Sequence, residues 1–404
     1  MTIVAILDDE AAFAHFRDLW SLDPRVSYLN HGSFGPPPRS VLAARHAWLD
    51  KLSANPMDFY VRQLGGHLQH ARGRLAQLVG TSGENLAFVE NASTGMNIVA
   101  DSVSLQPGDE VLTTDHDYGA VMRTWRRVCE AAGANLVVQA VPLPLQSPGQ
   151  IVTAIMSGVT PRTRLLVFSH VTSPTAIVFP AREICSAARE RGLPVCIDGP
   201  HAVAMRPLDL DSLNCDFYTA SCHKWLSAPF GSGFLYVHPR RQAGLWPSVL
   251  SWGRPLGDDV PSWRDEFNWV GTRDPSAYLA LPDAIRFLDD AGWETFRGRT
   301  HYLASLARQR ISALTGLEPL TPDGPEWYGS MVALPLPNPP DGQLPHDWTQ
   351  PDPLQTALWN DRGMEVPIVW WNNRRMIRVS CHLYTTAAEI DRLVAALADL
   401  LPRR

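Results

Sequence analysis

The sequence predicts an α/β protein with a large, mainly parallel-sheet domain followed by a smaller α+β domain. From about Gly80 onward, short apolar runs alternate with amphipathic helical segments, which is typical of a parallel sheet covered by helices. After Pro282 the pattern changes to a long helical segment, a strand and a closing helix. We therefore expect an N-terminal arm at residues 1–25, the large domain at 26–280 and the small domain at 281–404.

The individual elements follow from the same patterns. Strands of the large domain are predicted at residues 110–114, 135–141, 164–169, 193–198, 217–220 and 233–237. A helix is predicted at 181–191 with its stop at Gly192, and a long helical segment at 283–316. Many prolines at 335–353 predict a loop or lid. Residues 376–380 predict a strand, and 387–401 predict the closing helix.

Composition favours small-molecule chemistry in a reducing compartment. The net charge of -6 at pH 7 disfavours a nucleic acid or an anionic membrane as a partner. Six scattered cysteines predict neither a disulfide framework nor a metal site, so a cytoplasmic location is expected. The first twenty residues lack a signal-peptide pattern, and no apolar stretch is long enough for a bilayer. A nucleotide-binding oxidoreductase is also disfavoured, because no Gly-x-Gly-x-x-Gly turn opens a βαβ unit.

A lysine after a predicted strand is the first candidate catalytic residue. Residues 216–226 read as a strand that ends in small and polar residues and is followed by Lys224. Ligands of α/β proteins bind at the carboxyl ends of the strands. A lysine there, screened from water and close to other positive groups, has a lowered pKa and attacks an aldehyde as the free amine. An isolated lysine would more often be a surface residue, so the neighbouring motifs decide.

Asp198 ends another apolar strand upstream of the lysine. A carboxylate held against a pyridine nitrogen keeps that nitrogen protonated, so that the ring accepts electrons from a carbanion at Cα. A lysine paired with an aspartate in this way is the pattern of pyridoxal 5'-phosphate (PLP) enzymes. The alternative for an Asp-Gly pair after a strand is an ordinary turn.

The phosphate of such a cofactor requires backbone amides at the start of a helix. Residues 90–97 follow a short apolar run and precede an apolar segment, which favours this geometry. A plain helix N-cap remains the alternative for this segment. The candidate phosphate-binding residues are Ala92, Ser93, Thr94, Ser221 and His223.

Together these motifs resemble class V of the PLP-dependent aminotransferase superfamily, and in particular its isopenicillin N epimerase-like branch. The resemblance rests on residues 28–35 (YLNHGSFG), 115–120 (DHDYGA), 169–175 (SHVTSPT), 195–202 (VCIDGPHA), 221–225 (SCHKW) and 269–274 (WVGTRD). These phrases run in family order from residue 28 to about 385. The resemblance implies the aspartate-aminotransferase-like fold (fold type I), an α-amino acid substrate, and a homodimer with its active sites at the interface.

The resemblance also assigns roles to residues around the cofactor. Lys224 matches the lysine that carries PLP as a Schiff base, and Asp198 matches the partner of the pyridine nitrogen. His201 lies where the family bonds the phenolic oxygen of the cofactor, and Tyr118, rather than His116, is expected to stack on the ring. Thr172 is a further cofactor-binding candidate, and Gly271 and Thr272 match a segment that reaches the phosphate of the neighbouring subunit.

Substrate-binding residues are assigned in the same way. Arg378 matches the arginine that forks onto the α-carboxylate of the substrate. Asn30 and His31 are expected in the side-chain pocket, together with tryptophans of residues 246–263 and 370–371, which would give an aromatic lining. If these tryptophans pack in the core instead, that lining is absent.

The resemblance implies a reaction that begins with removal of the Cα proton by Lys224 after the amino acid has displaced it from the cofactor. An epimerase or racemase is the preferred reading, which requires a second acid such as Tyr118 or His31. The alternatives are a β-eliminating carbon-sulfur lyase, a class V aminotransferase and a non-catalytic protein on the same scaffold. A persulfide-forming desulfurase is not expected, because residues 363–377 contain no cysteine.

Overall fold

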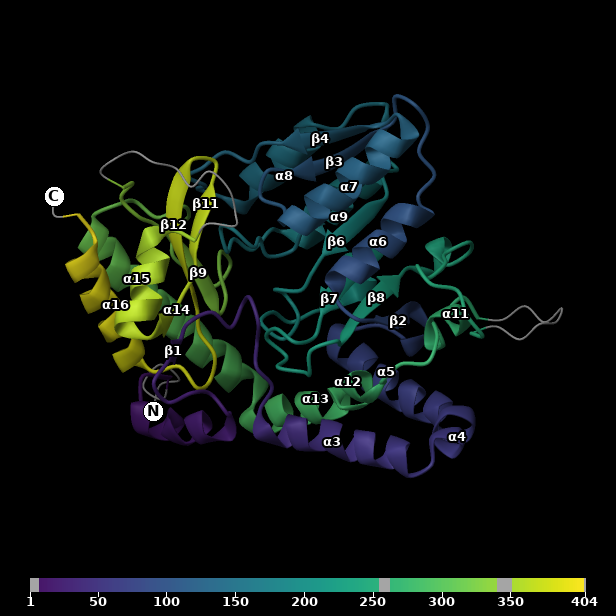
Figure 1. The fold of residues 1–404 in the computed structure, drawn as a ribbon. Coiled ribbons are helices and arrows are strands. Elements are labelled where there is room, and N and C mark those ends of the chain that lie inside the picture. The colour runs from purple at the N-terminus through teal and green to yellow at the C-terminus, as the bar shows by residue number, and fades with distance from the viewer. Residues whose placement is uncertain (1–6, 254–261, 340–350, 403–404) are drawn as a thin grey trace.

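The computed structural model describes residues 7–253, 262–339 and 351–402. A large domain built on a seven-stranded sheet lies beside a small domain built on a three-stranded sheet (Figure 1). The order of the large sheet is β2-β8-β7-β6-β5-β3-β4, and β8 is the strand that runs antiparallel to its neighbours. Its strands are β2 (Leu86–Val89), β3 (Glu110–Thr114), β4 (Asn135–Gln139), β5 (Thr163–Ser169), β6 (Val195–Asp198), β7 (Phe217–Ser221) and β8 (Gly233–Val237). This mainly parallel sheet confirms the predicted fold class.

Helices cover both faces of the large sheet, which explains why its central strands β6 and β7 are buried at every position. All four residues of β6 are buried, whereas the edge strand β4 has exposed positions. One core contains side chains of α6 (Ala92–Ser102) and α7 (Gly119–Ala132). The other core contains side chains of α5 (Leu64–Val79), α8 (Pro148–Ser157) and α9 (Ala181–Glu190). The sheet is thus a rigid platform whose strand ends can carry a site.

Several further helices belong to the large domain and its connection to the small one. They are α3 (Arg39–Ala54), α4 (Pro56–Asp58), α10 (Leu210–Leu213), α11 (Asp265–Asn268), α12 (Ser276–Leu279) and α13 (Leu281–Ala291). The single long helical segment predicted at 283–316 is wrong, because α13 and α14 (Trp293–Thr315) are separated at Gly292. Gly292 has φ +81, a left-handed conformation that a helix interior does not accommodate.

The small domain combines an antiparallel sheet, ordered β11-β12-β9, with helices packed on it. Its elements are β9 (Met331–Pro335), α15 (Pro353–Arg362), β10 (Met364–Glu365), β11 (Ile368–Trp371), β12 (Arg374–Ser380) and α16 (Ala387–Leu400). The predicted loop at 335–353 fits between β9 and α15, although its residues 340–350 lie outside the described residues.

The N-terminal segment contacts the small domain. Strand β1 (Ser27–Tyr28) pairs in parallel with β10, and Asn30 forms a bridge with Ser380. The short helix α2 (Glu10–Phe13) lies near the small domain as well (Figure 1). The chain therefore passes along the small domain before it enters the large one. Within the described ranges, no helix has the length and apolarity needed to cross a membrane.

Candidate active site

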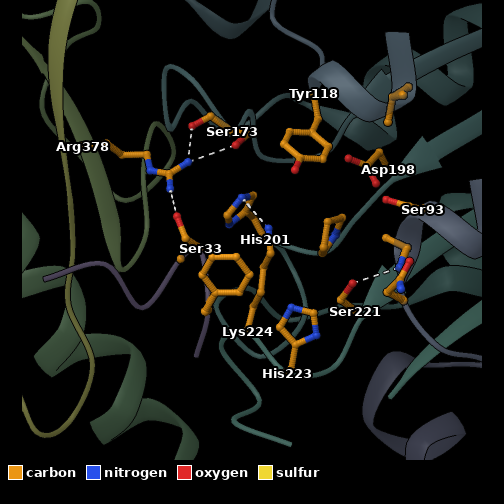
Figure 2. Close-up of a pocket in the computed structure, with 16 residues that line it drawn as sticks. Ser33, Ser93, Tyr118, Ser173, Asp198, His201, Ser221, His223, Lys224 and Arg378 are labelled. Atoms are coloured by element: carbon orange, nitrogen blue, oxygen red, sulfur yellow. Dashed lines mark hydrogen bonds between the residues drawn. The ribbon is translucent and has the colours of Figure 1, made fainter. Parts of the chain in front are cut away.

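A cavity of about 420 Å³ opens at the carboxyl ends of the large-domain strands, between the two domains (Figure 2). It brings together nine of the predicted site residues: Ala92, Ser93, Tyr118, Asp198, His201, Ser221, His223, Lys224 and Arg378. The other lining residues are Gly32, Ser33, Phe34, Asn91, Val121, Ser173 and Pro200. Residues from 32 to 378 thus meet in one place.

Two adjacent parallel strands position the lysine and the aspartate. Strand β6 ends at Asp198, which pairs with Thr219 of β7. Shortly after β7 ends, the chain turns and presents Lys224 to the same cavity. Lys224 Nζ lies 3.0 Å from His201 Nε2, so the amine is held by a hydrogen bond to a residue that follows β6.

The environment of Lys224 favours its neutral form. Burial lowers the pKa of Lys224, and the positive charge of Arg378 lowers it further, whereas Asp198 acts in the opposite direction. A lysine with a lowered pKa carries a larger fraction of free amine at neutral pH. The site therefore contains an amine suited to attack a carbonyl carbon or to accept a proton.

Asp198 is buried in the same cavity. Burial raises its pKa and the nearby Asp117 raises it further, whereas Lys224 lowers it. Asp117 itself accepts hydrogen bonds from the hydroxyls of Thr113 and Thr114 and from Ser169 Oγ at 2.7 to 2.8 Å. A cationic group placed against Asp198 would stabilise its charged form, and a protonated pyridine nitrogen is such a group.

Helix α6 supplies the predicted anion-binding end. Ser93 lines the cavity, and its side chain points inward in Figure 2. The Ala92 N–H donates to Ser221 Oγ at 2.9 Å, which ties the helix start to the end of β7. Thr94 does not line the cavity, because its N–H and hydroxyl both donate to Asn91, which caps the helix. Asn91 is thus the N-cap residue and occupies the donors of Thr94, while Ser93 remains available to a phosphate.

Two buried histidine nitrogens fit a bound anionic group. The Nδ1 atoms of His201 and His223 are buried and have no hydrogen-bond partner within the described structure. Burial and the charge of Lys224 lower the pKa of both rings, to about 4 for His223, so both are neutral. Buried polar atoms normally have partners, and the oxygens of PLP would supply them here. The amine, the carboxylate, the helix end and these nitrogens fit PLP.

Arg378 forms the opposite side of the cavity. Its Nη1 donates to the Ser173 carbonyl at 2.8 Å and to Ser173 Oγ at 3.0 Å, and its Nη2 donates to Ser33 Oγ at 2.6 Å. Burial lowers the pKa of Arg378 to about 10, which still leaves the side chain charged at neutral pH. Its Nε is buried without a partner in the described structure. A charged, partly unsatisfied guanidinium of this kind can bind a carboxylate.

Three predicted residues lie near the cavity without lining it. The His31 ring is fully buried against Tyr384 and the Lys224 carbonyl, so it is not positioned to contact a substrate. Asn30 donates to Glu365, which directs its amide toward β10. The Thr172 hydroxyl bonds to Thr175 at 2.6 Å and points into the loop after β5. The cavity lining therefore does not include these three residues.

The expected aromatic pocket is absent from the described cavity. Trp371 Nε1 donates to the Asp115 carbonyl, and Trp370 Nε1 donates to Asp352, so both rings pack elsewhere. The lining contains Phe34 and Tyr118 as its phenyl-type side chains. Part of the 246–263 stretch, residues 254–261, lies outside the described residues.

Gly271 and Thr272 do not line this cavity within one chain. Gly271 has φ +108, a conformation that suits glycine, and Thr272 is exposed. Their contact with a neighbouring subunit stays a prediction.

Sequence reasoning missed several lining residues that lie within or next to the motifs it used. Ser33 and Phe34 lie within the 28–35 phrase, Ser173 lies within the 169–175 phrase, and Asn91 precedes the chosen helix start. For Asn91 a signal existed, because asparagine is a favoured N-cap residue. For Ser173 no such signal existed. Side chains alternate between the two faces only within a strand, so this period does not predict which residue of the following loop faces the cavity.

Comparison with known proteins gives a consistent picture. The family model of aminotransferase class-V matches residues 28–393. The chain is 40% identical to an isopenicillin N epimerase of Amycolatopsis lactamdurans, over 96% of this chain and 98% of that protein. It is 37% identical to an isopenicillin N epimerase of Streptomyces clavuligerus, with 98% and 99% covered. It is also 30% identical to putative L-cysteine desulfhydrase 1 of Oryza sativa subsp. japonica, with 93% and 83% covered.

Solved structures share the fold. A C-DES mutant with glycine covalently linked to its PLP cofactor has a TM-score of 0.80 at 22% identity, with 97% of this chain and 99% of that chain covered. The cysteine desulfurase CsdA of Escherichia coli has a TM-score of 0.77 at 22% identity, with 96% and 99% covered.

Proposed function

Because the chain belongs to the PLP-dependent aminotransferase class-V family, we propose that it is an amino-acid epimerase of the isopenicillin N epimerase kind. The observation that carries this proposal is the 40% identity to such an epimerase over nearly the full length of both chains. The cavity supports it, because an amine and a carboxylate-binding guanidinium face the same space.

Seven residues would hold the cofactor. Lys224 would bind it covalently and Asp198 would pair with its ring nitrogen. Ser93, Ser221 and His223 would bind its phosphate, His201 its phenolic oxygen, and Tyr118 one face of its ring. When bound, PLP withdraws electrons from Cα of the substrate and so makes the Cα proton acidic.

Side chains of this protein supply substrate binding, proton transfer and positioning of the amine. Arg378, held by Ser33 and Ser173, binds the α-carboxylate and orients the substrate. The free amine of Lys224 is the general base that accepts the Cα proton, and its lowered pKa suits that role. His201 Nε2, 3.0 Å from Nζ, positions the amine.

Epimerisation requires a proton donor on the opposite face of the substrate. Of the two donors considered from sequence, His31 lies outside the cavity, whereas Tyr118 lines it. Tyr118 enters from the side opposite Lys224 in Figure 2. Tyr118 is 49% exposed, so solvent reaches this residue. We therefore assign the second proton transfer to Tyr118.

A β-eliminating carbon-sulfur lyase is the second candidate, and the likeness to the rice desulfhydrase favours it. That reaction would use the same Lys224 and Arg378 but would not need Tyr118. Persulfide formation is not proposed, because all six cysteines are buried and none lines the cavity. Cys222, next to the lysine, has a pKa raised by burial, which disfavours a thiolate.

The test is to incubate the PLP-loaded protein in deuterated water with isopenicillin N and with a panel of L- and D-amino acids and cysteine conjugates. An epimerase incorporates deuterium at Cα and inverts its configuration, which chiral chromatography and mass spectrometry detect. Tyr118→Phe should lose inversion while it retains some exchange without inversion. Release of pyruvate and sulfide from the cysteine conjugates, without inversion of any substrate, would contradict the epimerase proposal in favour of the lyase.

A further inference from the structure

Buried side chains outside the cavity lining hold the turn that carries Lys224. The Ser227 N–H donates to the Lys224 carbonyl at 2.8 Å and closes the turn. Ser227 has φ +53, which is costly for a residue with a side chain and persists only where surrounding contacts impose it. His31 Nε2 lies 3.0 Å from the same carbonyl. The backbone of Lys224 is therefore fixed by two donors.

The proton on His31 can be assigned from its partners. The ring is fully buried, and burial together with His382 lowers the pKa of His31 well below its usual value, so the ring is neutral. A carbonyl only accepts, so Nε2 carries the proton and donates to Lys224. Nδ1 is then an acceptor for the Tyr384 hydroxyl at 2.9 Å. The Lys224 carbonyl thus selects this tautomer, and the Tyr384 hydroxyl stabilises it by donating to Nδ1.

A second histidine completes the support. The His382 ring stacks on His31 with 4.1 Å between ring centroids. His382 Nε2 lies 3.3 Å from Ser227 Oγ and 3.4 Å from the Trp225 carbonyl. Gly35 closes the remaining space, since a Cβ there would lie 2.5 Å from His31 Nε2. Glycine at position 35 therefore leaves the space that the His31 ring needs to reach the Lys224 carbonyl.

The same N-terminal segment also touches the substrate side of the cavity. Ser33, two residues after His31, accepts a hydrogen bond from Arg378 at 2.6 Å. The Ser33 N–H donates to the Asn30 carbonyl at 3.0 Å, which makes residues 30–33 a closed turn. One short turn therefore contacts both catalytic-site residues. Its His31 ring reaches the backbone carbonyl of Lys224, and its Ser33 hydroxyl reaches the side chain of Arg378.

We propose that His31 is a positioning residue, which fixes the Lys224 turn and keeps the amine at a set place relative to Arg378. This inference rests on the proposed role of Lys224 as the cofactor-binding residue. It differs from a substrate-binding role, because His31 acts on the lysine backbone and does not face the cavity.

Two substitutions separate positioning from general packing. In His31→Gln the side-chain amide nitrogen can reach the place of Nε2 and donate to the Lys224 carbonyl. In His31→Asn the shorter side chain reaches only the place of Nδ1, and the carbonyl loses this donor. Both variants carry an amide and both remove the ring, but asparagine is one methylene shorter, so the thermal stability of each is measured as well. A pure packing role would change stability without slowing bond formation in His31→Asn relative to His31→Gln.

The measurement is the rate at which cofactor-stripped protein forms its covalent bond to added PLP, followed by absorbance. Borohydride reduction and peptide mapping then identify the modified lysine. We expect His31→Asn to slow bond formation about tenfold, the size of one lost hydrogen bond, and His31→Gln to stay within about threefold of wild type. Equal effects of the two variants, or changes in thermal stability alone, would overturn the inference.

Tyr384→Phe provides a second test if His31→Asn does not fold. It leaves His31 in place and removes only the hydroxyl that donates to Nδ1 and so stabilises the tautomer with the proton on Nε2, and we expect bond formation to slow about threefold. An unchanged rate in this variant would contradict the tautomer argument and the inference built on it. Attachment of PLP to a residue other than Lys224 in wild type would instead overturn the proposed function itself.

Discussion

The two halves of the cavity are assembled in different ways. The half around Lys224 and Asp198 comes from the ends of β6 and β7, which are hydrogen-bonded neighbours in one sheet. The half around Arg378 is built from β12 of the small domain, Ser33 of the N-terminal segment and Ser173 of the large domain. Neighbouring strand ends of one sheet place the first half, and His31 of the N-terminal segment supports its Lys224 turn. The second half depends entirely on how separate parts of the chain pack. Changes in the second half should therefore alter substrate binding while cofactor attachment persists.

The largest expected effect concerns the support of β12. Arg375 of β12 forms a buried ion pair with Asp352, which caps the start of α15, and the Asp352 and Arg375 side chains are 1% and 6% exposed. Asp352→Asn would leave the Arg375 charge without its partner, which costs about 3–5 kcal/mol of unfolding free energy. Denaturant unfolding of the wild type and the variant measures this loss of unfolding free energy. Asp399→Asn, which breaks an exposed pair with Arg362, is the matched control with little expected change.

The same pair predicts an acid dependence of stability. Burial raises the pKa of Asp352, but hydrogen bonds from Arg375, the Leu354 N–H and Trp370 outweigh it, so the pKa lies below its usual 3.8. A lowered folded-state pKa contributes stability that is full above pH 3.8 and is lost as the pH falls toward the folded-state value. Asp352→Asn should flatten that acid limb of the stability curve. An unchanged limb would contradict this assignment.

Asp198→Asn tests the lysine half. Loss of the carboxylate removes the charge that stabilises a protonated ring nitrogen, so we expect kcat to fall about 10²–10³-fold. Covalent attachment of PLP to Lys224 should persist, since Lys224 and His201 remain. Steady-state kinetics and borohydride trapping measure the two quantities separately. A kcat near that of wild type would mean that Asp198 does not serve the cofactor ring.

Arg378→Lys tests the arginine half with the charge retained. The forked donors are lost, so kcat/KM should fall about 10–100-fold, mainly through KM. Since a positive charge stays near Lys224, cofactor attachment should keep its wild-type rate. An Arg378→Lys variant that binds substrate normally but fails to attach PLP would mean that the arginine half serves the cofactor instead of the substrate. That result would contradict the comparison.

The smallest expected effects concern the serines that hold the guanidinium. Ser33→Ala removes the partner of one nitrogen, and we expect KM to rise about fivefold. Ser173→Ala should have a smaller effect, because the Ser173 carbonyl still accepts from Arg378. Kinetics of both variants would rank them. A larger loss in Ser173→Ala would indicate that its hydroxyl, rather than its carbonyl, holds the arginine.

The same contrast explains how much was predictable from sequence. Strands β3 and β8 were predicted with their observed limits, and Lys224 and Asp198 were found because apolar runs locate strand ends. The position of a side chain beyond a strand end is not set by that period, so Thr172 was chosen where Ser173 lines the cavity.

Long-range packing explains the other differences. His31 lies in the correct motif, but only its tertiary contacts with Tyr384 and His382 show that the ring faces the core. The break at Gly292 was missed because helical periodicity continues on both sides of it. Pairing of β1 with β10 joins residues more than three hundred positions apart, and no local pattern predicts it.

The most direct test of the account is an absorption spectrum of the PLP-loaded protein, followed by borohydride reduction and peptide mapping, in wild type and in Lys224→Ala. The account predicts a band at about 410–430 nm, as expected of PLP bound to a lysine. Addition of an amino acid substrate should shift it. The account further predicts a reduced cofactor on Lys224 in wild type and none at that position in the variant. Wild-type protein with no such band and no trapped adduct at Lys224 would contradict the central claim.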